Sequence, residues 1–297
     1  MSILETIGKP EPRAPIMTIC GDAGTGKTSL AATFPNPIFI RTEDGLHRIH
    51  KDIDAPDAFP LVAKEDDLWP QLMALLQEDH NYRTLVIDSV SALEPIFTES
   101  ILAQDGRAKT LSTALGGYGA GYAALAAKHR RVRKACGLLN ARKNMAIIFI
   151  SHAELETMRL PDADDYARYS LRLNSKSLPP YVDDVDTVAF VRLVSALRGD
   201  EGDRKKIISN GDREMVCFAT AASVSKNGFG ITEPVELVPG ENPFAPYLGL
   251  IKAKAKAEPK AKAEPKAKTK PEPKQAQGGD EAEIEINPAD FVAEEVE

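Results

Sequence analysis

The feature that most constrains this sequence is the octapeptide at positions 21–28, Gly-Asp-Ala-Gly-Thr-Gly-Lys-Thr. It matches the phosphate-loop pattern G-x-x-x-x-G-K-[ST] at every fixed position. Its glycines let the backbone curl so that several N–H groups point at phosphate oxygens. An apolar strand is predicted at 16–20 and a helix at 27–34, ending before Pro35. Strand, loop and helix are the setting that the motif requires, so the chain is predicted to bind a nucleoside triphosphate.

Each part of the motif has a chemical role in holding ATP and Mg²⁺. The Lys27 ammonium adds positive charge at the β- and γ-phosphates, and the Thr28 hydroxyl is placed to ligate the metal. The following helix adds the positive end of its dipole. The predicted nucleotide-binding residues of this segment are Gly21, Asp22, Ala23, Gly24, Thr25, Gly26, Lys27, Thr28 and Ser29.

A second apolar strand, Thr84 to Asp88, supplies the other half of such a site. A carboxylate that ends a strand of this kind holds the Mg²⁺ shell, often through water. The 60 residues between Thr28 and Asp88 leave room for a predicted strand at 38–41 and a helix at 66–77. We therefore predict Thr28 and Asp88 as the metal site. The alternative is an aspartate that merely ends a buried strand.

The carboxylate that activates water is the next question. In one large class of phosphate-loop proteins a glutamate directly follows the metal aspartate, but here Asp88 is followed by Ser89. The other position for such a base is the end of the strand next to the phosphate loop, and Glu43 is predicted there. The alternative for Glu43 is a solvated acid in a turn.

The rest of the chain first continues the alternation of helices and strands and then changes to strands. Helices are predicted at 91–104 and 122–140, followed by a buried strand at 146–150 that ends in Ser151-His152. Later strands are predicted at 187–194, 204–209 and 214–222, with turns at Gly199–Gly202 and at Asn210-Gly211. The Asn-Gly pair is a hairpin signal. Two irregular segments, 105–121 and 153–180, combine basic side chains with tyrosines. For either segment, a surface loop without function is the alternative to a DNA contact.

Charge is unevenly distributed along the chain, whose net charge is −7. Residues 252–274 carry nine Lys against three Glu, and residues 280–297 carry eight acids and no base. The remaining mildly acidic body does not indicate nucleic-acid binding, so any such contact needs a local basic patch. The three cysteines show no metal-ligand spacing and fit a reducing cytosol. No apolar run is long enough for a membrane span, so no membrane partner is expected.

Four segments carry a resemblance to RecA-like recombinases: Phe39 to Leu46, Thr84 to Ser89, Ile148 to His152, and Ser225 to Asn227. They occur in the order of that family's motifs. More closely, the chain resembles the compact phage RecA-like ATPases linked to single-strand annealing, the Sak group, over residues 15–248. The resemblance implies an α/β fold: a RecA-like P-loop NTPase core with a mostly parallel central sheet flanked by helices, followed by a C-terminal β-hairpin extension and a disordered tail.

The resemblance also implies roles for individual residues. Glu43 would orient and deprotonate the attacking water, with Lys27 and His152 as the other catalytic residues. His152 stands where the family has a polar residue that senses the γ-phosphate; a strand-end histidine bonded to backbone is the alternative. Lys226 would reach the triphosphate of a neighbouring subunit, although the family's second lysine is replaced here by Gly228. Segments 105–121 and 153–180 would occupy the places of two DNA-binding loops.

These expectations divide the chain into an N-terminal arm at 1–14, an ATPase core at 15–250, a Lys/Ala/Pro-rich linker at 251–279 and an acidic tip at 280–297. The expected function is a DNA-dependent ATPase that binds single-stranded DNA as a homo-oligomer and promotes annealing or strand exchange. Its expected location is the host cytoplasm, and a single-strand-binding or replication protein is a candidate partner. One alternative is an ATP-dependent loader that recruits a partner through its tail. The other is a small-molecule kinase with a lid built from Arg159, Arg168 and Arg172.

Overall fold

The computed structural model describes residues 3–8, 12–161, 164–198 and 206–248. All of them belong to one compact unit, Met1–Ala255, and a second unit comprises Lys256–Glu297. The predicted linker, acidic tip and disordered tail therefore lie outside the described residues.

The described chain forms a nine-stranded sheet in the order β3-β2-β4-β5-β1-β7-β8-β9, with β6 paired to β5 beside that path. The strands are β1 (Ile16–Gly21), β2 (Pro37–Arg41), β3 (Asp57–Ala58), β4 (Thr84–Asp88), β5 (Ala146–Met158), β6 (Tyr166–Leu171), β7 (Thr187–Arg198), β8 (Lys206–Val216) and β9 (Val235–Glu236). The α-helices are α1 (Lys27–Ala32), α2 (Glu65–Gln77), α3 (Val90–Gln104), α4 (Ala120–Lys143) and α5 (Pro179–Val182).

The centre of the sheet is parallel and its margins are antiparallel. Strands β3, β2, β4, β5, β1 and β7 pair in parallel, whereas β6 on β5 and β8 and β9 beyond β7 pair antiparallel. The predicted fold class, a mostly parallel sheet with flanking helices and a hairpin extension, is confirmed. Because the carboxyl ends of parallel strands share one edge, the register aligns Arg41 with Asp88 and Gly21 with His152.

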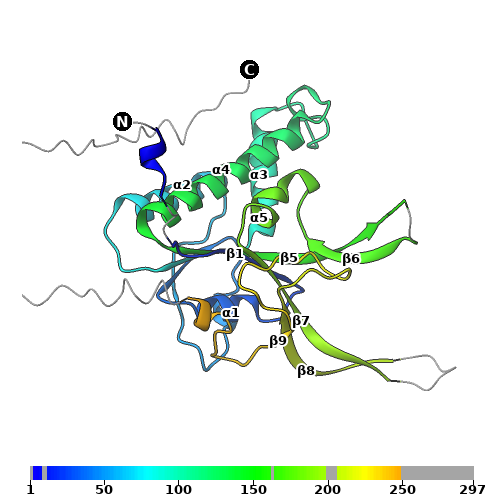
Figure 1. Ribbon diagram of the computed structural model, residues 1–297. Coiled ribbons are helices and arrows are strands. Elements are labelled where there is room, and N and C mark those ends of the chain that lie inside the picture. Colours follow the sequence, from blue (N-terminus) through cyan, green and yellow to red (C-terminus); the bar gives the residue numbers. More distant parts are fainter. Residues whose placement is uncertain (1–2, 9–11, 162–163, 199–205, 249–297) are drawn as a thin grey trace, which may run out of the picture. The chain divides into compact units, whose positions relative to one another are not determined.

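Helices cover both faces of this sheet, with α1 on one face and α2, α3 and α4 on the other (Figure 1). All six residues of β1 and all five of β4 are buried, as expected for parallel strands that are covered on both sides. The core on the α1 side consists of alternate residues of neighbouring strands together with Leu30 and Phe34 and, further along the chain, Phe244. No helix within the described ranges is long and apolar enough to cross a membrane.

The Asn210-Gly211 turn predicted from the sequence is wrong. Strand β8 runs through both residues, and the connection between β7 and β8 falls at 199–205, outside the described residues. The register shifts from Leu193↔Arg213 to Ser195↔Ser209, so β8 carries the extra residues of a bulge there. Gly211 has a φ of 91°. A positive φ suits a bulge as well as a turn, which explains why the dipeptide misled the prediction.

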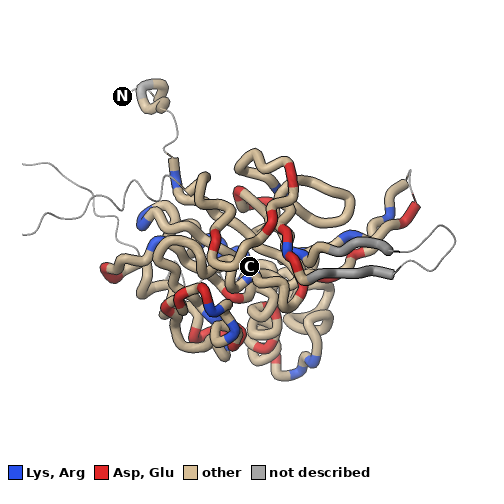
Figure 2. The backbone as a smooth tube through the Cα atoms, turned by 90° about the horizontal axis from the view of Figure 1, so that it is seen from below, with Lys and Arg blue, Asp and Glu red and all other residues tan. Residues whose placement is uncertain are grey.

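The irregular segment predicted at 153–180 is also wrong in part, because residues 153–158 and 166–171 form strands. Strand β5 continues past His152 to Met158 and pairs with β6 as an antiparallel hairpin. The hairpin and the β7–β8 hairpin both project beyond the sheet on the same side (Figures 1 and 2). Leu155 and most of its neighbours on the extension are exposed. An exposed strand lacks the one-sided apolar pattern by which strands are recognised from sequence.

Replacement of Gly21 by alanine should destabilise the fold. A Cβ at Gly21 would lie 2.3 Å from the Val191 carbonyl oxygen, because β1 and β7 pair at that position. Relieving such overpacking typically costs about 1–3 kcal/mol, measurable as a lower urea midpoint. Gly45→Ala is the matched control, since nothing lies within 4 Å of its Cβ position and its φ is −109°. Equal stability of the two variants would contradict the prediction.

Candidate functional site

The phosphate loop joins β1 to α1 at the carboxyl edge of the sheet. Gly24 and Gly26 have φ values of 78° and 92°, a left-handed conformation that glycine adopts without strain. The buried Lys27 Nζ donates to the carbonyl oxygens of Gly21 (2.9 Å) and Asp22 (2.8 Å). Burial lowers the pKa of Lys27. The lysine is thus held against its own loop, with its charge at the site where the motif binds phosphate.

Thr28 and Asp88, the predicted metal ligands, are in contact. The Thr28 hydroxyl donates to Asp88 Oδ2 at 2.7 Å. Burial raises the pKa of Asp88, and the hydrogen bond from Thr28 opposes that shift. Among the described residues no cluster of three or more His, Cys, Asp or Glu could hold a metal alone. One hydroxyl and one carboxylate fit Mg²⁺, which takes few protein ligands and completes its shell with water and phosphate oxygens.

Glu43 and His152, predicted separately, are hydrogen-bonded to each other. His152 Nε2 lies 3.0 and 3.1 Å from the two carboxylate oxygens of Glu43. Ser89 Oγ also donates to Glu43 Oε1, at 2.5 Å. These bonds, that of His152 above all, lower the pKa of Glu43 to about 2. The carboxylate is therefore held in place by two side chains, although it is 39% exposed.

One part of the argument for Glu43 is wrong. Strand β2 does not lie next to the phosphate-loop strand, because β4 and β5 are inserted between β2 and β1. Glu43 nevertheless reaches the site, since the turn after β2 is bonded to the end of β4. Thr42 N donates to the Asp88 carbonyl (2.8 Å), and Ser89 N donates to Thr42 Oγ1 (2.7 Å). Sequence reasoning missed Thr42 and Ser89, although both adjoin residues that it selected.

His152 is anchored through its backbone as well as its ring. Its N–H donates to Ser91 Oγ at 3.0 Å, and Ser91 Oγ lies 3.0 Å from Ser151 Oγ. The ring bonds to Glu43 rather than to backbone, unlike the alternative considered from sequence. The next residue, Ala153, already pairs with Leu171 in the β5–β6 hairpin. The candidate γ-phosphate sensor is thus continuous with a projecting hairpin.

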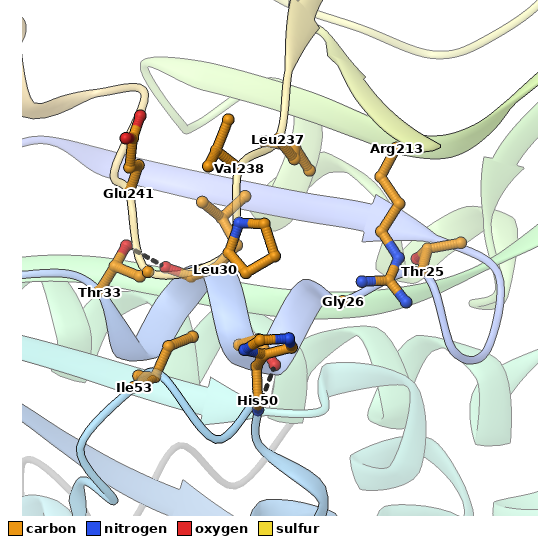
Figure 3. A pocket seen from close by; sticks show the side chains of 13 residues that line it. Thr25, Gly26, Leu30, Thr33, His50, Ile53, Arg213, Leu237, Val238 and Glu241 are labelled. Atoms are coloured by element: carbon orange, nitrogen blue, oxygen red, sulfur yellow. Dashed lines mark hydrogen bonds between the residues drawn. The ribbon is translucent and has the colours of Figure 1, made fainter. Parts of the chain in front are cut away.

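A pocket opens beside the phosphate loop (Figure 3). Thr25, Gly26 and Arg213 lie at one end, and Glu241 lies at the other end beside Thr33. Between them the lining is mainly apolar, and His50 is bonded through its N–H to Ser29 Oγ at 3.4 Å. The other lining residues are Leu30, Ile53, Leu237, Val238, Pro239 and Gly240. A charged end on the phosphate loop and an apolar middle suit the two parts of a nucleotide.

Lys226 is not brought to the phosphate loop of its own chain. It forms an isolated bridge with Val188, near the start of β7, and its Nζ donates to the Asp183 carbonyl at 2.6 Å. In the parallel pairing Val188 aligns with Thr18, three residues before Gly21. A contact of Lys226 with a nucleotide of another subunit stays a prediction.

The two candidate DNA-binding segments differ in character. On the β5–β6 hairpin, Arg168 pairs with Glu156 at 3.3 Å and Arg159 lies 3.6 Å from Asp165, so both arginines have acidic partners. Between α3 and α4, five successive residues from Leu115 to Gly119 have positive φ values, and Tyr118 is fully exposed. Acidic and basic residues are interspersed along the described chain (Figure 2) rather than gathered on one face in that view.

Comparisons with known proteins give a family match and a structural similarity. No curated protein matches the chain. Among solved structures, a crystal structure of the RadB recombinase is similar over 69% of this chain and 81% of that chain, with 13% sequence identity and a TM-score of 0.39. A family model described as AAA domain matches residues 13–224, which include the phosphate loop, Asp88, Glu43 and His152. Since this family model covers most of the chain, the chain belongs to the AAA domain family.

Proposed function

We propose that this chain is a DNA-dependent ATPase that binds single-stranded DNA as a homo-oligomer and promotes annealing or strand exchange. The observation that carries the proposal is the Glu43–His152 hydrogen bond, at 3.0 Å, directly before the β5–β6 hairpin. A ligand group that replaced water or the Glu43 carboxylate as the hydrogen-bond partner of His152 would shift β5 at the point where it enters that hairpin. Hydrolysis and the hairpin would in this way be coupled through one residue.

The residues of the chain divide the chemistry between them. Lys27 exchanges its hydrogen bonds to the two loop carbonyls for contacts with the β- and γ-phosphates. Its positive charge there stabilises the negative charge that develops on the phosphoryl group. Glu43, held by Ser89 and His152, orients the attacking water and accepts its proton. Mg²⁺, bound through Thr28 and Asp88, would neutralise phosphate charge.

The nucleoside would occupy the pocket beside α1. Leu30, Ile53 and Leu237 offer apolar surface to a base, and His50 offers a ring. Ser29, one residue after the phosphate loop, lies in the same pocket and connects it to the phosphates. This position accounts for the apolar lining next to a loop built for anions.

Single-stranded DNA is the proposed regulator because of the segment between α3 and α4 and the projecting hairpins. Tyr118 exposes its whole ring, and Arg107 and Lys109 lie in the same segment. Exposed aromatic rings stack on unpaired nucleobases, and Lys and Arg side chains bind the phosphates of the DNA backbone. Neither contact depends on the nucleotide sequence. Lys226 of one subunit would approach the triphosphate of the next, which makes the oligomer part of the site.

The test is ATP turnover measured with and without single-stranded oligonucleotides, together with a mobility shift of a labelled oligonucleotide with and without ATP. We expect turnover to rise with DNA and the shift to require ATP, and both effects to weaken with salt. Duplex DNA of the same length is the control for preference. Turnover that ignores DNA, with no ATP-dependent shift, would remove the proposal.

The small-molecule kinase is disfavoured by the placement of its candidate lid. Arg159 and Arg168 lie near or in a strand hairpin and contact carboxylates, which argues against a lid built from them. Arg172, the third candidate, is close enough to Glu43 for its charge to help lower the pKa of that carboxyl group. The loader hypothesis depends on the tail, which lies outside the described residues.

A further inference from the structure

A cationic side chain that the proposed chemistry does not use lies over the phosphate loop. Arg213 of β8 extends toward Thr25 and Gly26 (Figure 3), and its Nη2 lies 3.4 Å from the Gly24 carbonyl oxygen. A Cβ on Gly26 would be 3.6 Å from both Cδ and Nη1 of Arg213. The guanidinium is thus packed against the loop whose N–H groups bind phosphate.

The hydrogen-bonding capacity of Arg213 is mostly unused. A guanidinium carries five N–H donors, yet Nε of Arg213 is buried without a partner and Nη2 makes one long bond. Arg192, on the strand paired with β8, is different: its Nε and Nη2 donate to Glu214 at 2.7 and 2.6 Å. A buried donor without a partner costs free energy unless a ligand satisfies it. Arg213 therefore has the character of a ligand-binding side chain.

The ligand that fits is a phosphate group. Arginine binds phosphate through two parallel N–H···O bonds, a geometry that its planar fork matches. The carboxylate that lines this pocket, that of Glu241, lies at the opposite end beside Thr33 (Figure 3), so it does not neutralise Arg213. The phosphate loop directly beneath supplies further N–H donors.

The topology decides which phosphates Arg213 would contact. Glu43 follows β2, Asp88 ends β4 and His152 lies in β5. These strands are all on one side of β1, whereas β8 lies on the other side beyond β7. Arg213 therefore faces the loop from the side opposite the hydrolytic carboxylate. It shares its pocket with Ser29 and the apolar lining, not with Glu43. This position corresponds to the phosphates next to the nucleoside.

We propose that Arg213 binds the α- and β-phosphates of the nucleotide from within the same chain, and so contributes to the affinity for nucleoside di- and triphosphates alike. The inference rests on the nucleotide-binding part of the proposed function and is independent of DNA. It adds a second cation, opposite Lys27, to the phosphate loop.

The experiment measures the affinities of the full chain for ADP and ATP by calorimetry with Mg²⁺ and without DNA. Arg213→Ala should lower the affinity for both nucleotides by about tenfold, since the loss of a hydrogen bond to a charged group typically has an effect of that size. Arg213→Lys, which keeps the charge but loses the fork, should lie between the alanine variant and the wild type. Arg192→Ala, on the paired strand, is the matched control and should bind both nucleotides as the wild type does.

Three results would overturn the inference, and a fourth would separate it from the proposed DNA function. Unchanged affinity of both Arg213 variants would show that the side chain does not contact the nucleotide. A lower affinity for ATP with an unchanged affinity for ADP would place Arg213 at the γ-phosphate instead. Failure of DNA to stimulate turnover, with nucleotide affinity still dependent on Arg213, would remove the proposed DNA function and leave this inference standing. A wild-type chain that binds neither nucleotide would end both.

Discussion

Glu43→Gln is expected to reduce ATP hydrolysis by about 10²- to 10⁴-fold, the usual contribution of a general base, while nucleotide affinity stays at the wild-type level. Glutamine has the shape of glutamate and keeps an oxygen that can accept from Ser89 and His152, which bond to Glu43 in the structure. It cannot take up the proton of water. The change thus removes the chemistry and preserves the local packing.

Steady-state turnover and nucleotide affinity, measured on the same preparation, check this result. Asp44→Asn is the matched control, because Asp44 is the next residue, is 69% exposed and lies 3.5 Å from Arg41 rather than at the site. Turnover of the Glu43 variant within a few-fold of wild type would assign the base to another residue.

The pH dependence of the wild-type chain gives a second check. The hydrogen bond from His152 lowers the pKa of Glu43 to about 2. A carboxyl group with a depressed pKa keeps its charge above the unfolded-state value of 4.5 and loses it only as the pH falls through about 2. Protonation of Glu43 therefore does not account for any loss of turnover between pH 5 and 8, and such a loss would point to another group.

Much of this site was predictable because local sequence determines it. Buried parallel strands are continuous apolar runs, so the strands that carry the phosphate loop and Asp88 were recognised within a residue of their bounds. The loop's glycines and Lys27 act within a few residues of one another. Glu43 and His152 were each selected from the end of a strand, but their contact joins residues 109 positions apart.

The features that were missed depend on strand order and on exposed pairing. Arg213 meets the phosphate loop 189 residues from Gly24, because β8 is two strands from β1 in the sheet. No local pattern distinguishes Arg213 from Arg192, which pairs with an acid on the same hairpin. The Asn210-Gly211 pair predicts a turn, whereas the structure has a bulge there, because both accept a positive φ at glycine. A single sequence predicts the backbone conformation of Gly211, but it does not predict which residues of β7 and β8 pair around it.

Lys27→Ala is expected to reduce ATP turnover by about 10³-fold or more, since it removes a cation placed where the transferred phosphoryl group gains charge. The folded chain should survive the change. Among the described residues Lys27 Nζ donates to the carbonyls of Gly21 and Asp22, so the change removes two hydrogen bonds to the backbone of the loop. Burial already lowers the pKa of Lys27, so the free protein holds this charge at a cost.

Thermal unfolding with and without Mg²⁺ and ATP separates the two effects. A ligand that binds the folded state raises the melting temperature, and by more when it binds more tightly, so the wild type should be stabilised by ATP and Lys27→Ala much less. Lys64→Ala, whose side chain is 69% exposed at the start of α2, is the control for loss of a lysine. If Lys27→Ala melted like the wild type without nucleotide and was stabilised equally by ATP, Lys27 would not bind phosphate. Because Arg213 of β8 packs against the same loop, a partial ATP shift in Lys27→Ala that disappears in the double variant would show that two cations share the nucleotide.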